Sequence, residues 1–323
     1  MTRPLSLLAL ALCAALLVPS TGCQKKSDAR RIAVIPKGTT HEHWKGVEAG
    51  ARRAAAELGV EVIWKGPEKE DDRAGQQKVV EQFVSEGVAA IVLAPLDKEA
   101  LLPRVKQAAA AKIPVVIIDS PLAGEQGKDF VSLVATDNEK GGYLGGQALA
   151  KALGGKGKVV LLRYMENSAS TEQREAGFLR AMKEAPGITV TSENQYAGAT
   201  ADTAQKKAEA MLDTLRQADG IFCPNESSTQ GMLTALERAG MLGADQKVKF
   251  VGFDKSGPLV TALEAGKIQA LVAQNPEKMG YEAVKAAVSQ LDGKPPAAVI
   301  DTGVVVITKE NLAAPEVKSL LGR

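Results

Sequence analysis

Short segments rich in β-branched residues alternate with longer amphipathic segments along most of this chain. The short segments have the length and composition of buried strands, and the longer ones have the apolar spacing of helices that cover a sheet. This alternation predicts parallel sheets with helices on both faces, and therefore an α/β fold. The predicted strands are 31–35, 60–64, 88–93, 115–118, 157–162, 219–222, 248–252 and 268–273. The predicted helices are 43–58, 73–86, 98–111, 139–153, 171–184, 201–216, 227–239 and 276–291.

Glycines mark the ends of three of these helices. Gly59, Gly87 and Gly240 each follow the last apolar position of a helical pattern. Glycine adopts the left-handed conformation that often ends a helix without steric cost. We therefore expect these three residues to be helix caps.

The first 22 residues have the features of a secretory signal. Arg3 precedes an apolar run from Leu5 to Val18, and small residues follow it. This run of 14 residues is shorter than the roughly 20 that a membrane-spanning helix needs. A cleaved leader is therefore favoured over a membrane anchor.

The segment STGC at 20–23 resembles the lipobox of bacterial lipoproteins, although Ser20 stands where Leu is usual. In that pattern the cysteine becomes the lipidated first residue of the mature chain. We therefore expect a lipoprotein signal peptide over 1–22, lipidation at Cys23 and a polar tether over 23–30. The predicted location is the periplasm or the cell surface, with the protein anchored to a membrane by lipid.

Length, charge and cysteine content limit the possible functions. Removal of 22 of the 323 residues leaves 301, a length that predicts two domains at roughly 100 to 200 residues each. The remaining 39 basic and 38 acidic residues provide no electrostatic reason to bind nucleic acid or an anionic membrane. Cys223 alone remains after Cys13 and Cys23 are assigned to the leader and the lipid, so no internal disulfide is expected. A buried strand position is favoured for Cys223 over a reactive thiol.

Polar side chains follow five of the predicted strands. In open parallel α/β sheets, ligands bind beyond the carboxyl ends of the strands, so these residues are candidates for a binding site. Two carboxylates, two amides and one amine suit a small uncharged polyol with many hydroxyl groups. Each residue taken alone could instead be an ordinary helix cap or turn residue. The five residues are Lys37, Asp119, Asn225, Asp254 and Gln274.

The same positions resemble the ribose- and galactose-type periplasmic sugar-binding proteins, which are the substrate-binding components of ABC importers. The resemblance extends from about Arg31 to Ile307, and its motifs are specific together rather than singly. The segments that carry it are IPVVIIDSP at 113–121, ATDNEKGGYLGG at 135–146, STEQREAGF at 170–178, CPNES at 223–227, VGFDKS at 251–256 and LVAQNPEKMG at 271–280.

The resemblance implies the type I periplasmic binding protein fold. This fold has two doubly wound, Rossmann-like lobes with parallel sheets, joined by a three-strand hinge. The implied N-terminal lobe comprises 31–136 and 275–300, and the C-terminal lobe comprises 137–274 and 301–323. The expected crossings lie near 136, 274 and 301. The expected protein is a monomer, is not an enzyme and uses no cofactor, and its partners are a small sugar or polyol and an ABC transporter permease.

The resemblance also implies contact roles for five residues. Arg174 enters the site only through the family pattern Arg-x-x-Gly-Phe, because it lies near the start of a predicted helix rather than after a strand. Ligand should favour the closed state of the lobes, since neither half-site satisfies a sugar alone. The five residues with implied contact roles are Asp119, Arg174, Asn225, Asp254 and Gln274.

This chain departs from the ribose type in three places. Ser120 stands where ribose binders carry an Arg, so one hydroxyl clamp is missing, although Ser120 stays among the candidate ligand contacts. Small residues at 198–200 replace an aromatic wall. The segment 41–44 reads His-Glu-His-Trp where the family has Asn-Pro-Phe-Phe. The ligand is therefore expected to be something other than simply ribose.

The segment 41–44 suggests a specific hypothesis for the ligand. His43 and Trp44 take the two aromatic positions that lie against a sugar ring, and His41 and Lys37 are hydrogen-bonding neighbours. Trp44 could instead be plain packing at the start of a helix. A metal held by His41, Glu42 and His43 is disfavoured, because a stable site needs three or four ligands and the chain has no third histidine.

Other functions remain open at this point. A sensory receptor that passes a sugar or sugar-derived signal to a chemoreceptor or kinase would have the same cleft. The segment VIPK at 34–37 resembles autoinducer-binding relatives with a lysine at Lys37. A secreted hydrolase would need a catalytic pair such as Asp119 and Asp254, and no Gly-x-Ser-x-Gly nucleophile motif is present. An effector domain of a repressor is disfavoured, because a leader occupies the place of a DNA-binding motif.

Overall fold

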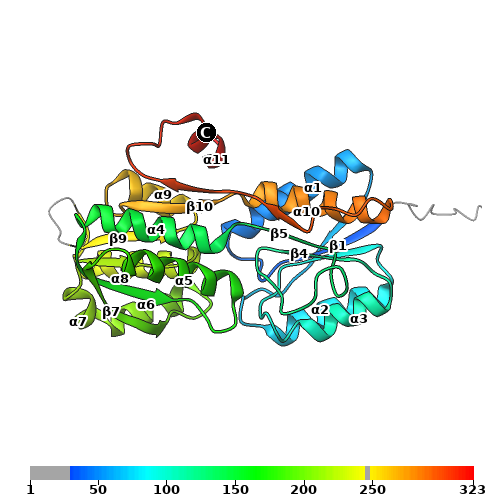
Figure 1. Cartoon of the computed structure of the whole chain (residues 1–323), viewed down its shortest axis with the longest axis horizontal. Coiled ribbons are helices and arrows are strands. Elements are labelled where there is room, and N and C mark those ends of the chain that lie inside the picture. The colour runs from blue at the N-terminus through cyan, green and yellow to red at the C-terminus, as the bar shows by residue number, and fades with distance from the viewer. Residues whose placement is uncertain (1–29, 244–247) are drawn as a thin grey trace, which may run out of the picture.

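The computed structural model describes residues 30–243 and 248–323. They form two lobes, each built around a six-stranded sheet with helices on both faces (Figure 1). The predicted signal peptide, Cys23 and the tether up to residue 29 lie outside the described residues. Among the described residues, no helix is both long enough and apolar enough to cross a membrane.

The first lobe contains an entirely parallel sheet with strand order β11-β5-β4-β3-β1-β2. Helices α1 and α10 pack on one face of this sheet, and α2 and α3 pack on the other. The strands are β1 (Arg31–Ile35), β2 (Glu61–Trp64), β3 (Ala90–Leu93), β4 (Val115–Ile118), β5 (Ser132–Ala135) and β11 (Val299–Asp301). The helices are α1 (Glu42–Leu58), α2 (Arg73–Glu86), α3 (Leu102–Ala110) and α10 (Pro276–Leu291).

The second lobe has strand order β12-β10-β9-β8-β6-β7, and only β12 runs antiparallel to its neighbour. Helices α4 and α5 cover one face, and the remaining helices cover the other. The strands are β6 (Lys156–Arg163), β7 (Gly187–Tyr196), β8 (Gly220–Phe222), β9 (Lys249–Phe253), β10 (Ala270–Gln274) and β12 (Val304–Ile307). The helices are α4 (Asn138–Ala152), α5 (Ala169–Lys183), α6 (Ala201–Ala210), α7 (Leu212–Arg216), α8 (Glu226–Arg238), α9 (Gly257–Glu264) and α11 (Pro315–Leu321).

The central strands follow directly from their sequence. All residues of β3 and β4 are buried, as expected for continuous apolar strands covered by helices on both faces. The predicted left-handed caps at Gly59, Gly87 and Gly240 are confirmed by φ values of 66°, 64° and 66°. Cys223 is buried and free, and burial raises the pKa of its thiol. Its predicted burial is confirmed, but it lies directly after β8 rather than within a strand.

The predicted elements were incomplete, and three of the four missed strands lie at sheet edges. Strands β5, β7, β11 and β12 and helices α9 and α11 had no predicted counterpart, and the single predicted helix 201–216 is divided into α6 and α7 at Met211. Strand β7 contains many polar residues and pairs with β6 alone, so its burial alternates instead of being continuous. A polar edge strand such as β7 lacks the uninterrupted apolar run on which the prediction depended.

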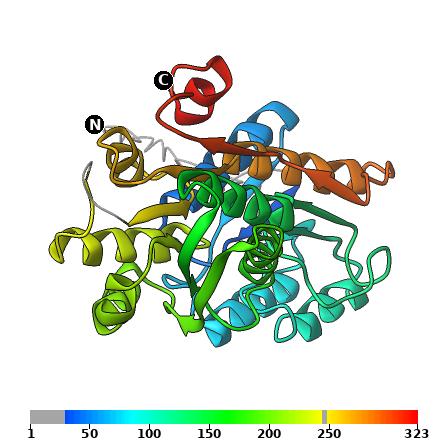
Figure 2. The same cartoon turned by 60° about the vertical axis from the view of Figure 1, so that its left-hand side comes forward.

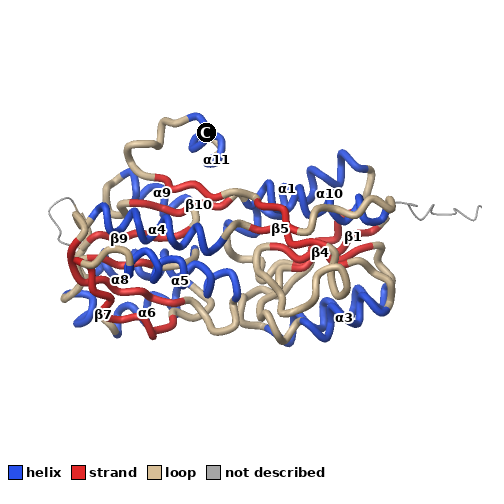
Figure 3. Tube along the Cα trace, viewed as in Figure 1, coloured by secondary structure: helices blue, strands red, loops and turns tan. Residues whose placement is uncertain are grey.

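The chain passes between the two sheets three times. The first passage follows β5 and leads into α4, the second follows β10 and leads into α10, and the third joins β11 to β12. Figures 2 and 3 show these segments next to one another between the lobes. Because each lobe is built from separate parts of the chain, the site between them draws on distant parts of the sequence.

Candidate functional site

Two aspartates occupy matching places in the two lobes. Asp119 follows β4 and Asp254 follows β9. Each of these strands is the fourth in its sheet when the strands are counted from the edge formed by β2 or by β7. Both residues have left-handed backbones, with φ of 63° and 73°. Asp tolerates this conformation better than most residues, and such outliers often occur at functional sites.

A small cavity lies between the lobes and has a volume of about 30 Å³. Nine of the ten predicted site residues line it, and Ser120 is the exception. The structure therefore brings together side chains from at least seven separate segments of the chain. The nine residues are Lys37, His41, His43, Trp44, Asp119, Arg174, Asn225, Asp254 and Gln274.

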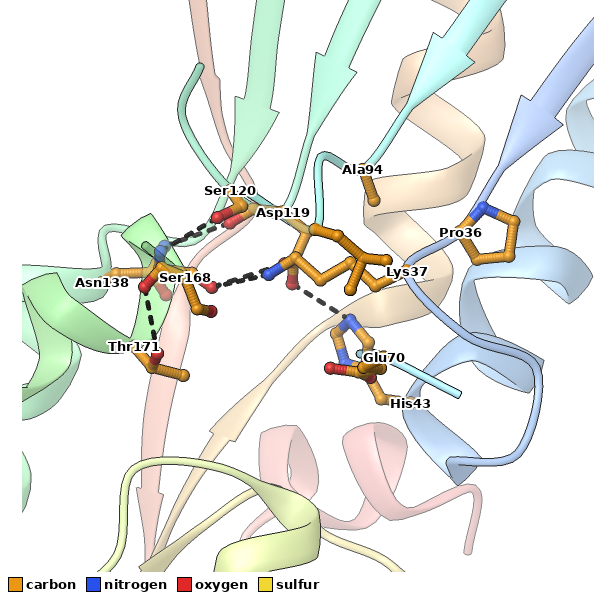
Figure 4. Close-up of polar contacts among 12 residues, drawn as sticks. Pro36, Lys37, His43, Glu70, Ala94, Asp119, Ser120, Asn138, Ser168 and Thr171 are labelled. Carbon is orange, nitrogen blue, oxygen red and sulfur yellow. Dashed lines mark hydrogen bonds and ion pairs between the residues drawn. The ribbon is translucent and has the colours of Figure 1, made fainter. Parts of the chain in front are cut away.

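Asp119 belongs to a network of polar contacts that joins both lobes (Figure 4). Its carboxylate lies 2.7 Å from Lys37 Nζ and 3.3 Å from His43 Nε2. Lys37 also donates to the hydroxyl of Ser170 in the second lobe, and the Ser170 backbone N–H donates to Ser120 Oγ, each over 3.0 Å. Burial opposes ionisation, but the charge of Lys37 and the contact with His43 hold the pKa of Asp119 well below its usual range.

Glu70 is the centre of a second buried cluster. One of its oxygens accepts from Trp44 Nε1 over 2.6 Å and lies 2.8 Å from His41 Nδ1. The other accepts from the hydroxyl of Tyr164, in the second lobe, over 2.7 Å. Trp44 is 3% exposed and belongs to the core beneath α1, as the packing interpretation expects, and it also lines the cavity.

The His41 and Glu70 pair carries opposite charges. Burial lowers the pKa of His41, but the charge and hydrogen bond of Glu70 outweigh burial and raise it to about 9. Burial raises the pKa of Glu70, but the charge and hydrogen bond of His41 lower it to about 2. Burial, and then the charge of Glu70, also raise the pKa of Tyr164.

Glu226 binds the N-terminus of a helix in the other lobe. Its carboxylate accepts the backbone N–H groups of Glu42 and His43, at the start of α1, over 3.0 and 3.1 Å. These N–H groups have no partner within α1, and the helix dipole favours a negative charge there. Glu42 in turn accepts the N–H of Gly257 at the start of α9, over 3.0 Å. The two lobes therefore cap each other's helices.

Arg174 is fully enclosed next to the cavity. Its guanidinium donates to Asn138 Oδ1 over 2.8 Å and to the Pro224 carbonyl over 3.0 Å, and it lies 4.0 Å from the ring centroid of Phe253. Its Nη2 has no hydrogen-bond partner among the described residues. Burial lowers the pKa of Arg174, but acidic neighbours oppose that effect. The free donor is suited to an oxygen atom of a ligand.

Three further predicted residues line the cavity, namely Asn225, Asp254 and Gln274. Asn225 caps α8 by accepting the Ser228 N–H over 3.2 Å, so its predicted alternative role as a helix cap is present as well. Asp254 accepts from the Glu226 N–H and from Gln274 Nε2, each over 2.8 Å. These bonds hold the carboxylate of Asp254 at the edge of the cavity.

A family model described as a periplasmic binding protein domain matches residues 32–295. The chain belongs to this family. The D-ribose/D-allose-binding protein of Pseudomonas aeruginosa is 31% identical over 315 residues, which cover 95% of this chain and 97% of that protein. The type I fold predicted from the sequence is confirmed.

Solved structures of other periplasmic components are similar over most of the chain. The periplasmic component of an ABC-type sugar transport system from Hahella chejuensis is 38% identical, with a TM-score of 0.81 over 86% of this chain and 99% of that chain. A carbohydrate transporter solute-binding protein from Agrobacterium radiobacter, in complex with D-arabinose, is 34% identical, with a TM-score of 0.86 over 91% and 99% of the two chains.

Several residues of this binding protein's cavity were missed from the sequence. Tyr164 directly follows β6, so the rule of inspecting strand ends could have found it. Glu226 is adjacent to Asn225 and could have been inspected with it. Glu70 lies in a run of charged residues after β2, and such a run predicts an exposed loop. No feature of the local sequence distinguishes Glu70 from its charged neighbours. The other missed lining residues are Ser168, Ser170 and Thr171.

The histidines of the binding protein face separate carboxylates. His41 lies next to Glu70, and His43 lies next to Asp119. Residues 30–243 and 248–323 contain no group of three His, Cys, Asp or Glu side chains arranged to hold a metal ion. The two histidines instead contact two different carboxylates that line the cavity.

Proposed function

We propose that this periplasmic binding protein captures a small neutral sugar or polyol between its lobes and delivers it to an ABC importer. The observation that carries the proposal is the convergence of charged, amide and hydroxyl side chains from both lobes on one cavity. Hydroxyl groups both donate and accept, so a sugar can satisfy carboxylates, amides and a guanidinium at once. The sugar ligands named for the relatives support this assignment.

The balance of charge in the cavity favours a neutral ligand. The carboxylates of Glu70, Asp119, Glu226 and Asp254 are offset by Lys37, Arg174 and the His41 imidazolium. The carboxylates exceed these cations by one, so an anionic sugar would add a second uncompensated negative charge in a buried site, at a high electrostatic cost. A neutral sugar leaves the balance unchanged.

Ligand entry requires the lobes to separate. The cavity volume of about 30 Å³ is far below the roughly 300 to 1,000 Å³ of typical ligand pockets. Three contacts that cross the cavity hold the lobes together, namely those of Lys37 with Ser170, Tyr164 with Glu70, and Glu226 with α1. We infer that a sugar replaces part of these contacts with its own in the closed, ligand-bound state.

The lobe boundaries and the location also belong to this proposal. The lobes comprise 31–136 with 275–300, and 137–274 with 301–323, a division supported by the packing of α10 on the first sheet. A leader over 1–22 and a lipid at Cys23 would keep the protein outside the cytoplasm and near a permease. The protein is proposed to act as a monomer.

The first experiment is a thermal-shift screen of the purified protein against D-ribose, D-allose, D-arabinose, other pentoses and hexoses, inositols, nucleosides and acidic sugars. A ligand that binds only the folded protein raises the melting temperature by mass action. We expect at least one neutral sugar to raise it, and Arg174→Met to abolish the rise. Lys267→Met, which alters an exposed ion pair with Glu237, is the control. A screen in which no sugar or polyol stabilises the wild type would overturn the proposal.

A further inference from the structure

Three buried side chains meet where the chain passes between the lobes. Thr136 lies on the first passage, Gln274 on the second and Thr302 on the third. Thr136 Oγ1 lies 3.0 Å from Gln274 Oε1 and 3.3 Å from Thr302 Oγ1. Their exposed fractions are 4%, 2% and 3%. All three passages are therefore joined by one small hydrogen-bonded cluster.

The chemistry of these groups sets the direction of every bond. The carboxylate of Asp254 can only accept, so the Gln274 amide must turn its NH₂ group toward it, over 2.8 Å. The amide oxygen of Gln274 then faces Thr136, whose single hydroxyl proton must go to that oxygen. Thr136 has no proton left for Thr302, so Thr302 is the donor in that contact.

We propose that Thr136 and Thr302 are positioning residues for the binding site. Their hydroxyl groups fix the Gln274 amide so that its NH₂ group holds the carboxylate of Asp254 at the cavity. The ordered chain of donors runs from Thr302 through Thr136 and Gln274 to Asp254, and the other oxygen of Asp254 accepts the Glu226 N–H. The geometry of the three passages is thereby linked to a side chain that lines the site.

The two threonines act through Gln274 rather than on a ligand. Neither threonine lines the cavity, whereas Gln274 and Asp254 do. Removal of the Thr136 hydroxyl would leave the buried amide oxygen of Gln274 without a donor and free the amide to rotate. Removal of the Thr302 hydroxyl would leave the Thr136 bond to Gln274 in place but less restrained, so its effect should be smaller.

The first test uses the ligand-free protein. The side-chain amide resonances of Gln274 are assigned by nitrogen-15 NMR from their loss in Gln274→Met, and their exchange with solvent is measured. We expect slow exchange in the wild type and in Thr136→Ser, and exchange about tenfold faster or more in Thr136→Val, because the anchoring bond is lost. In Thr302→Val, the second variant, we expect a smaller increase in the exchange rate of the Gln274 amide. Unchanged exchange in both valine variants would overturn the proposal.

The second test measures affinity for D-allose, D-ribose and D-arabinose by calorimetry and rests on the proposed function. Thr136→Val should weaken binding about five- to tenfold, as expected for one lost hydrogen bond, and Thr136→Ser should restore it. In the Gln274→Met background, Thr136→Val should weaken binding by less than about twofold, since the two residues act as one unit. Equal costs in both backgrounds would contradict positioning through Gln274.

A matched control separates this effect from the general loss of a threonine hydroxyl. Thr234 in α8 donates to the Gln230 carbonyl over 3.0 Å and does not line the cavity. Thr234→Val should change neither the amide exchange of Gln274 nor the affinity. If none of the three sugars binds, the proposed function is weakened, and the amide measurement still decides whether the threonines position Gln274.

Discussion

Asp119 and Asp254 are structural counterparts that face one cavity from opposite lobes. Each follows the fourth strand of its sheet, each has a left-handed backbone, and each forms hydrogen bonds or ion pairs within the cavity wall. Their partners differ, because Asp119 faces the Lys37 ammonium group and the His43 ring, whereas Asp254 accepts from an amide and a backbone N–H. The repeated fold thus places two similar carboxylates in different electrostatic surroundings.

The ion pair of Lys37 and Asp119 should behave as a coupled unit. Both side chains follow strands of the first sheet, so their contact does not depend on closure of the lobes. We expect Lys37→Met and Asp119→Asn each to lower the free energy of unfolding by about 3 kcal/mol, because each leaves a buried polar partner. Urea unfolding should show that the double variant loses clearly less free energy of unfolding than the sum of the two single losses. Strictly additive losses would show that the pair is not coupled.

Glu226 should favour the closed arrangement of the lobes. Glu226→Gln keeps the shape of the side chain but removes the negative charge at the N-terminus of α1, so the closed fraction should fall about fivefold. Fluorescence energy transfer between labels on the two lobes measures this fraction in ligand-free protein. Glu237→Gln in the same helix, which affects an exposed pair with Lys267, is the control. Equal responses of the two variants would contradict a role specific to Glu226.

The pair of His41 and Glu70 predicts a defined pH dependence. The pKa of His41 is raised from 6.5 to about 9, so its contribution to stability is complete below 6.5 and is lost as pH rises through 9. The pKa of Glu70 is lowered from 4.5 to about 2, so its contribution is complete above 4.5 and is lost as pH falls through 2. The pair therefore stabilises the fold most between about pH 4.5 and 6.5.

His41→Asn provides the corresponding measurement. Relative to the wild type it should lose roughly 3 kcal/mol of unfolding free energy at pH 6, and this difference should shrink toward pH 9.5. Denaturant unfolding at closely spaced pH values records the difference. A loss that is constant from pH 6 to 9.5 would mean that the imidazolium is not the stabilising form.

Trp44 should report ligand binding through its fluorescence. The chain has two tryptophans, and only Trp44 lines the cavity, whereas Trp64 lies on strand β2. A sugar that stabilises the protein should change the emission of the wild type and of Trp64→Phe, but not that of Trp44→Phe. Trp44→Phe should also lower the free energy of unfolding by about 1 to 2 kcal/mol, because Glu70 loses a donor. A ligand response that disappears with Trp64 instead would place the ligand elsewhere.

Local sequence determined the central elements and much of the cavity. The apolar runs that became β1 and β4 were predicted with the observed bounds, as were helices α2 and α10. Asp119 and Asp254 could be selected as candidates because parallel strands direct the residues after them toward one edge of the sheet. Arg174 required the family pattern, since its position within α5 has no such local signal.

Only the tertiary structure decided which distant side chains meet. Glu70, Tyr164 and Glu226 gain their roles from partners 26 to 184 positions away in the chain, on the opposite lobe or on a neighbouring element. The same is true of the contact between Thr136, Gln274 and Thr302. Strand periodicity and helix capping are short-range effects that a sequence displays directly. Electrostatic pairing and buried hydrogen bonds depend on distances that exist only after both lobes have folded and closed on each other.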